Sequence, residues 1–256
     1  MDDFLTKLIP DAERRIAAGY YNVQPTDERK RTTSLAAKIK NAPRNAIIAE
    51  IKPISPARGP LRPRLDPIDT ALQLQRGGAI GLSILTEPDN FGGSLTSLSR
   101  IRLHVKLPLL MKDIIIHERQ IEAAKNSGAD CILLIQSILS RTNNQTPTNL
   151  IKTAHDLQLE VLLEVHNSEE LGLASISEAD ILGINNRNLT NLEVDLNTTI
   201  ELVRTKKVNK VIITESGLER AEDLQKLKSH VDGFLIGSSI MLADDTESKV
   251  REFVLA

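Results

Sequence analysis

The sequence predicts an α/β protein with the (β/α)₈ or TIM barrel fold and an N-terminal helical extension. Eight short apolar segments recur along the 256 residues, and their starts lie 20 to 33 residues apart. The intervals between them carry apolar residues at helical spacing. Strand and helix alternating eight times is the arrangement of this barrel, and about 250 residues is a usual length for it.

Each apolar segment is predicted to be a strand buried on both faces. Uninterrupted runs of four to six apolar residues are typical of parallel sheets, which helices cover on both sides. The predicted strands are Ile47–Ile51, Ile80–Leu85, Pro108–Met111, Cys131–Ile135, Val161–Val165, Ile181–Ile184, Val211–Thr214 and Gly233–Ile236.

Helix signals fill the intervals. Asp66-Pro67 and Thr146-Pro147 each place a capping residue before a proline suited to the first helical turn. An apolar helical stripe follows the second of these at Leu150, Ile151, Ala154 and Leu157. A doubly wound open sheet is the alternative, but no G-x-G-x-x-G follows the first strand.

The first 45 residues precede the barrel. Ser34–Ile39 has the pattern of a short helix within this extension. No stretch resembles a linker, so we expect one domain over residues 1–256. The extension is predicted to pack on the barrel and cover one of its ends.

Composition excludes several classes of protein. The chain is 41% hydrophobic and 26% charged, which excludes a disordered protein. Aromatic residues are only 2% and the net charge is −2, so nucleic acid is not an expected partner. A small molecule is. With no signal peptide and no run of about 18 apolar residues, we expect a cytoplasmic protein that no membrane anchors.

The sequence offers little to a metal ion. Its single cysteine, Cys131, excludes an intramolecular disulfide and any zinc site that needs two cysteines. The five histidines form none of the common ligand spacings, and Glu164-Val165-His166 alone is a weak pair. We therefore expect no metal and no cofactor.

Five charged residues stand at the ends of predicted strands. Glu50 and Lys52 are two residues apart and so share one side of the first strand. The third strand ends in Lys112, the fifth carries Glu164, and the seventh ends in Glu215. Taken singly, each has an ordinary explanation as a snorkelling lysine or half of a structural ion pair. In a barrel, however, all five meet at one mouth, which predicts a catalytic site with perturbed pKa values.

Two loops indicate a phosphate group on the ligand. Ser216-Gly217 and Gly237-Ser238 follow the last two strands, where phosphate sites of such barrels are built. Glycine permits close backbone approach, although ordinary turns are the alternative. The basic loop Ser55–Arg64 is either a lid that attracts an anion or a solvated loop; the sequence leaves both open.

Several segments together resemble the indole-3-glycerol-phosphate synthase family, from about residue 46 to residue 241 and in the family's order. They are Ile48–Lys52, Ser55-Pro56, Gly81–Glu87, Leu110–Asp113, Leu163–His166, Gly183–Leu189, Glu215–Gly217 and Phe234–Ser239. The resemblance implies a barrel enzyme of tryptophan biosynthesis without cofactor or metal. Its substrate would be 1-(2-carboxyphenylamino)-1-deoxyribulose 5-phosphate, which ring closure with loss of carbon dioxide and water turns into indole-3-glycerol phosphate.

The resemblance also assigns roles. Lys112 matches the general acid that protonates the substrate carbonyl, and Lys52 matches the group that holds the substrate carboxylate and assists dehydration. Glu164 matches the second acid–base group, and Glu50 is expected to orient the lysines. The remaining residues of the implied catalytic site are Asn185, Glu215 and Ser216.

Substrate-binding residues are implied as well. Those for the phosphate and other anionic or polar groups are Ser55, Arg187, Gly217, Gly237 and Ser238. The sequence departs from the family pattern in having Pro53-Ile54 in place of further basic residues, and Ile114 where Phe is frequent. We therefore expect a largely aliphatic pocket for the substrate ring, built from Phe91, Ile114, Leu134 and Leu189.

The sequence leaves two alternative functions to weigh against this one. A related phosphate-sugar barrel such as phosphoribosylanthranilate isomerase needs an acid–base pair, typically a cysteine and an aspartate at strand ends, but Cys131 is predicted at a strand start. A non-catalytic phosphate-binding or assembly protein would gain little from two lysines and three glutamates in one mouth. We expect a monomer or a weak homo-oligomer acting on a phosphorylated small molecule.

Overall fold

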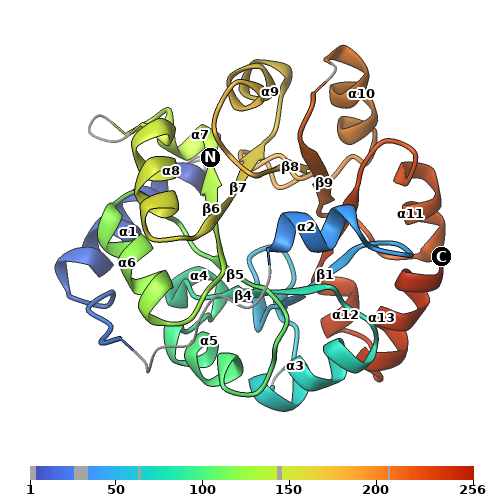
Figure 1. Cartoon of the computed structure of the whole chain (residues 1–256), viewed down its shortest axis with the longest axis horizontal. Helices are drawn as coiled ribbons and strands as arrows, with labels where there is room; N and C mark the ends of the chain where they lie inside the picture. The colour runs from blue at the N-terminus through green and yellow to red at the C-terminus, as the bar shows by residue number, and fades with distance from the viewer. Residues whose placement is uncertain (1–3, 26–33, 63–64, 143–145, 207) are drawn as a thin grey trace.

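The computed structural model describes residues 4–25, 34–62, 65–142, 146–206 and 208–256. Eight parallel strands close into a barrel and helices surround it, as Figure 1 shows. The predicted (β/α)₈ barrel is therefore confirmed. The strands are β1 (Ile47–Ile51), β4 (Gly81–Leu85), β5 (Leu109–Lys112), β6 (Cys131–Ile135), β7 (Glu160–Val165), β8 (Ile181–Asn185), β9 (Val211–Glu215) and β10 (Gly233–Ile236).

The strand bounds agree with the predicted segments to within one residue at each end. Where they differ at the carboxyl end, the strand continues into Lys112, Asn185 or Glu215. A scan for apolar residues stops before these polar side chains, whereas the strand is defined by backbone pairing. Leu85, for example, pairs with Lys112, and Asn185 with Glu215. The polar residues are thus part of the barrel wall.

Helices follow each strand and form the outer layer. They are α3 (Pro67–Arg76), α5 (Leu95–Arg102), α6 (Glu118–Asn126), α8 (Pro147–Asp156), α9 (Ser168–Ser175), α10 (Asn197–Thr205), α11 (Ala221–Leu227) and α13 (Thr246–Leu255). The predicted caps are confirmed, since Asp66 accepts the Ile68 N–H and Thr146 accepts the Asn149 N–H. Three short helices, α4 (Pro88–Phe91), α7 (Gln136–Leu139) and α12 (Ser238–Met241), follow β4, β6 and β10 directly.

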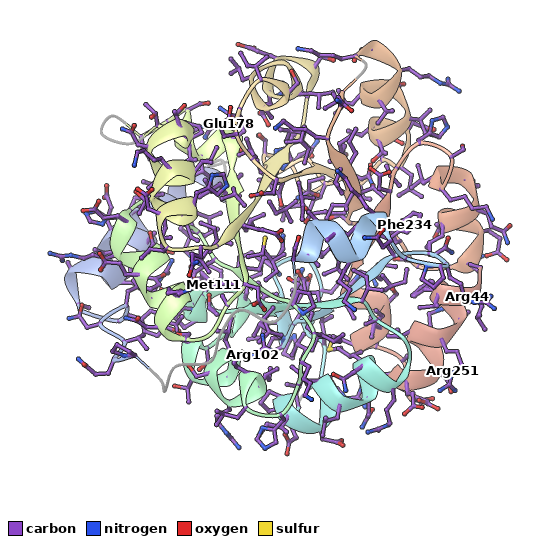
Figure 2. The ribbon with its side chains drawn as sticks, in the orientation of Figure 1. Arg44, Arg102, Met111, Glu178, Phe234 and Arg251 are labelled. Carbon is purple, nitrogen blue, oxygen red and sulfur yellow. The ribbon has the colours of Figure 1, made fainter. Side chains whose placement is uncertain are left out.

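The strands separate two apolar layers. Inside the barrel lie residues such as Ile48, Leu133 and Leu235, while Met111 and Phe234 belong to the larger layer between strands and helices. In Figure 2, Met111 and Phe234 lie among the ribbons, whereas Arg44, Glu178 and Arg251 lie toward the periphery. Side chains fill the amino end of the barrel, and a cavity lies at its carboxyl end.

The N-terminal extension packs on both ends of the barrel, not on one as predicted. Its residues 1–3 and 26–33 lie outside the described residues. Helix α2 (Leu35–Lys40) closes the amino end and crosses the centre of the barrel in Figure 1. Leu35 is fully buried there, and its N–H donates to Glu160 at the start of β7 over 2.7 Å.

Helix α1 (Phe4–Ala17) lies at the opposite, open end. Its Arg15 guanidinium pairs with Glu87 and Asp89, with Nη1–oxygen distances of 2.7 Å. Glu87 is fully buried and also caps α4 by accepting the Asn90 and Phe91 N–H groups. One buried ion pair therefore attaches the extension to the loop after β4.

The loop after β1 is partly ordered by pairing. Ile54–Ser55 (β2) and Gly59–Pro60 (β3) form a short antiparallel hairpin. At its tip, Arg58 forms an ion pair with Glu219 of the loop after β9. Residues 63 and 64 of the predicted basic loop lie outside the described residues. Whether the loop acts as a lid stays a prediction.

Replacing Arg15 with Met should destabilise the protein by about 3 kcal/mol, because it leaves the buried Glu87 carboxylate without its cation. The measurement is the free energy of urea unfolding. Arg14→Met is the matched control, since the Arg14 side chain is 61% exposed and its surface ion pairs should contribute little to stability. Equal losses in the two variants would contradict the anchoring role of Arg15.

Candidate active site

The carboxyl ends of the strands surround a cavity of about 260 Å³. Of the predicted site residues, these line it: Glu50, Lys52, Ser55, Phe91, Lys112, Ile114, Glu164, Asn185, Arg187, Leu189, Glu215, Ser216, Gly217, Gly237 and Ser238. They lie on five strands (β1, β5, β7, β8 and β9) and in the segments that follow β1, β4, β5, β8, β9 and β10. The barrel thus collects at one mouth groups that are up to about 190 residues apart in the chain.

Leu134 does not line the cavity, which corrects its prediction as a pocket residue. It lies in the apolar layer between strands and helices, while its neighbours Leu133 and Ile135 line the cavity. Successive side chains of a strand point to opposite faces, so only alternate residues of β6 face inward. The apolar run from Cys131 to Ile135 contains no polar residue that would reveal this alternation.

Lys112 is at the centre of the charged groups. Its Nζ lies 3.0 Å from Glu215 Oε2 and 3.3 Å from Glu164 Oε2, and all three side chains are at least 84% buried. Nearby, Lys52 Nζ lies 3.6 Å from Glu50 Oε1 and 5.6 Å from the centre of the Phe91 ring. The mouth therefore holds two lysines, each next to at least one carboxylate.

Burial and charge act in opposite directions on these groups. Burial alone would lower the pKa of Lys112, but the Glu215 and Glu164 carboxylates outweigh it and raise that pKa. Burial would likewise raise the pKa of Glu164, yet Lys112 and His166 hold it below its usual value. Lys112 is therefore protonated and Glu164 ionised at neutral pH, the protonation states from which an acid donates and a base accepts a proton.

Glu215 differs from Glu164 in its ionisation. Burial, assisted by the Glu164 charge, raises the pKa of Glu215 to about 7 despite the contact with Lys112. Among the described residues, Glu215 Oε1 has no hydrogen-bond partner. One carboxylate is thus ionised and the other is near its midpoint at neutral pH, so Glu215 can gain or lose a proton.

Two glycines leave the space that these carboxylates occupy. A methyl group on Gly183 would collide with Glu215 Oε1, and one on Gly237 would lie 2.6 Å from Glu50 Oε1. Gly183 and Gly237 face inward on β8 and just after β10, where any larger side chain would project into the mouth. Their role here is close packing against an acid.

The region predicted to bind phosphate lies at the end of β9 and β10. Gly217 adopts φ +81°, in the left-handed region that favours glycine, and Ser216 before it has φ +67°. Ser239 Oγ donates to the Leu218 carbonyl over 2.7 Å and ties the two loops together. Gly217, Gly237 and Ser238 therefore share one fixed wall of the cavity.

The structure adds residues that the sequence did not single out for the site. Leu8 of α1 lines the cavity, and so do Leu133 and Ile135 of β6. A polar inward side chain on β6 would have shown which residues of that strand face the cavity, but β6 has none. Nothing in the sequence indicates Leu8. In the part of the chain that the structure describes, no group of three or more His, Cys, Asp or Glu side chains is placed to hold a metal ion.

Comparison with known proteins identifies the family. The model of the family described as "Indole-3-glycerol phosphate synthase" matches residues 8–253. The chain belongs to this family. A protein named indole-3-glycerol phosphate synthase from Streptococcus sanguinis is 37% identical over 98% of this chain and 96% of its own. A protein of the same name from Sulfurimonas denitrificans is 42% identical over 80% of this chain and 78% of its own length.

Members of the indole-3-glycerol phosphate synthase family are carboxy-lyases of tryptophan biosynthesis, so this chain is an enzyme. Among solved structures, a thiamine phosphate pyrophosphorylase from Pyrococcus furiosus has a TM-score of 0.62 at 18% identity, covering 86% of this chain and 96% of that one. That likeness concerns the barrel fold alone. No helix within the described residues is long and apolar enough to span a membrane.

Gly183→Ala should lower kcat by about 100-fold, because the added methyl group forces Glu215 out of its position beside Lys112. The measurement is steady-state turnover of the synthase substrate. Gly172→Ala in α9 is the control, since the nearest atom to its added methyl group would be Lys206 Nζ at 3.9 Å. A folded Gly183→Ala enzyme with unchanged kcat would show that the placement of Glu215 does not matter.

Proposed function

We propose that this chain closes the indole ring of 1-(2-carboxyphenylamino)-1-deoxyribulose 5-phosphate to give indole-3-glycerol phosphate. The observation that carries the proposal is the protonated Lys112 held between Glu164 and Glu215 at the mouth of a barrel of this family. The reaction needs a buried acid and a base within a few ångströms of each other, and this cluster supplies both.

The first step joins the ring carbon that bears the carboxylate to the carbonyl carbon of the ribulose chain. Negative charge develops on the carbonyl oxygen as this bond forms, so a proton donor must lie beside it. Lys112 is the proposed donor. The carboxylates that raise its pKa also fix its ammonium group in position, which lowers the entropic cost of the step.

Loss of carbon dioxide and water completes the indole ring. The carboxylate leaves as carbon dioxide, and the new hydroxyl leaves with a proton as water. A base must then remove a proton from the neighbouring ring carbon, and the ionised Glu164 is the proposed base. Summed over all steps, each turnover takes up one proton from solvent when the substrate carboxylate is ionised.

The second lysine acts on the other side of the mouth. We assign Lys52 to the substrate carboxylate and to the hydroxyl that leaves, with Glu50 orienting its ammonium group at 3.6 Å. Asn185 supports the base, because its Nδ2 donates to Glu164 Oε1 over 3.0 Å. Glu215 and Ser216 complete the proposed catalytic set, with Glu215 available for proton exchange near neutral pH.

We propose that one part of the cavity wall binds the phosphate and sugar and that another, apolar part binds the substrate ring. The phosphate and sugar would contact Ser55, Arg187, Gly217, Gly237 and Ser238, all of which line the cavity. The substrate ring would contact the apolar side chains of Phe91, Ile114, Leu133, Ile135 and Leu189. Leu133 and Ile135 supply the contact that had been expected from Leu134.

The site does not favour the isomerase alternative. Cys131 is fully buried at the first position of β6, and its neighbour across the strands is Glu160 at the amino end of β7. A group at the amino ends cannot reach a substrate held at the carboxyl ends. We propose further that the enzyme works in the cytoplasm as a monomer or weak homo-oligomer. Its small net charge of −2 favours a function without nucleic acid.

Purified protein mixed with the carboxyphenylamino-deoxyribulose phosphate should produce indole fluorescence, also with EDTA present. The chain contains no tryptophan, which keeps the background emission low. Fluorescence that rises with enzyme concentration would support ring closure. A substrate that binds in calorimetry but yields no fluorescence would overturn the proposed reaction.

Lys112→Ala should lower kcat by about 10²–10⁴-fold, because the proton donor to the carbonyl is lost. Substrate binding, measured by calorimetry, should be largely retained because the phosphate wall is untouched. Lys106→Ala removes an exposed lysine a few residues away and should match the wild type. Near-normal turnover by folded Lys112→Ala would disprove the assignment of the general acid.

A further inference from the structure

One largely buried histidine that contacts the proposed base has no assigned role. His166 follows β7 immediately, and its imidazole lies between two carboxylates. Its Nε2 is 3.2 Å from Glu164 Oε1, and its Nδ1 is 3.3 Å from Glu170 Oε2. Only 12% of the side chain is exposed.

His166 does not face the substrate cavity. It lines a second cavity of about 440 Å³, together with Glu170 of α9. The two cavities share Asn185 and Arg187 in their walls. The imidazole therefore contacts the proposed base but lies outside the lining of the cavity that would hold the substrate.

Glu170 is itself held in place. Its Oε2 accepts the His166 backbone N–H over 2.8 Å, and its Oε1 accepts from Asn167 Nδ2 over 2.8 Å. Asn167 in turn caps α9 by accepting the Glu170 N–H. The chain His166–Glu170–Asn167 is thus fixed to the first turn of α9, which gives the imidazole little freedom to turn.

We propose that His166 is a positioning residue for the synthase reaction, which holds the Glu164 carboxylate ionised and correctly oriented by lying against it as an imidazolium. This inference rests on the proposed function, because it concerns how the base of that reaction is kept ready. Glu164 has two oxygens; Lys112 contacts Oε2, and His166 and Asn185 contact Oε1. Both oxygens are therefore fixed from the protein side.

Electrostatics supports a charged imidazole. Burial alone would lower the pKa of His166, but the contacts with Glu164 and Glu170 raise it to about 9. The imidazolium in turn contributes to the low pKa of Glu164. Among the described residues, Nε2 has no hydrogen bond of favourable geometry, although it lies 3.2 Å from Glu164 Oε1.

The other charged groups near His166 carry charges of both signs, so their effects on its pKa oppose one another. The second cavity is also lined by two arginines and two further acids, namely Arg141, Arg187, Glu193 and Asp195. Across Glu164 stand Lys112, Glu215 and Glu50. The opposite signs among these groups leave Glu164 and Glu170, the two carboxylates in direct contact, as the main determinants of the charge on His166.

The sign of the pH dependence follows. His166 is protonated below its raised pKa and loses its charge as the pH rises through about 9. Loss of that charge weakens the hold on Glu164, so kcat falls on the alkaline side. Glu170→Gln removes one of the two carboxylates, so the pKa of His166 drops and the alkaline fall should move to lower pH by about 1 to 3 units.

The test compares His166→Gln, Glu170→Gln and Glu169→Gln by kcat and KM across pH. His166→Gln should lower kcat by about 10- to 100-fold with KM little changed, and should move the acidic limb of the kcat profile to higher pH. Glu170→Gln should move the alkaline limb to lower pH. Glu169→Gln removes an exposed neighbouring acid and should leave both limbs in place.

Histidine NMR titration gives a readout that does not depend on turnover. The His166 resonance, assigned by its absence in His166→Gln, should titrate near pH 9 and at lower pH in Glu170→Gln and Glu164→Gln. Folded variants whose limbs and resonance do not move would overturn the inference. If the wild type does not turn over the substrate while the resonance behaves as expected, the proposed function fails and the charge on His166 stands.

Discussion

The withdrawal of Lys112, Glu164 and Glu215 from water is the constraint on which the rest of the site depends. Buried charges are tolerated only when each has a partner, since desolvation of an unpaired ion costs several kcal/mol. Here Lys112 contacts both acids, but His166 and Asn185 contact Glu164 alone, so the two acids have different pKa values. The same arrangement that keeps the mouth stable thus separates an ionised carboxylate from one near its midpoint.

The barrel provides the rigidity that this arrangement needs. Lys112, Glu164 and Glu215 each stand on a strand that is paired with a neighbouring strand on both sides, which fixes the backbone that carries them. Gly183 and Gly237 omit side chains where the carboxylates lie. His166 and Asn185 both contact the Oε1 atom of Glu164. The acid and the base are therefore positioned before substrate arrives, which is the main way a rigid site lowers a barrier.

The two ends of the barrel have different tasks. At the amino end, α2 buries Leu35 and Ile39 against the barrel interior and closes it. At the carboxyl end, α1 adds Leu8 to the cavity and is fastened through Arg15 to the loop after β4. The extension thus supports stability at one end and shapes the site at the other, although both helices lie in one short stretch of sequence.

The sequence by itself determined the eight strands, the capped helices and the charged residues at the mouth. Strands buried on both faces leave continuous apolar runs, and lysines and glutamates at their ends stand out against such runs. The same continuity hid the direction of each side chain, so Leu134 was placed in the cavity that Leu133 and Ile135 line. Only the tertiary structure decided the direction of these side chains. It also decided that the extension packs on both ends of the barrel and that His166 contacts Glu164. Each depends on contacts between segments or faces that no local pattern encodes.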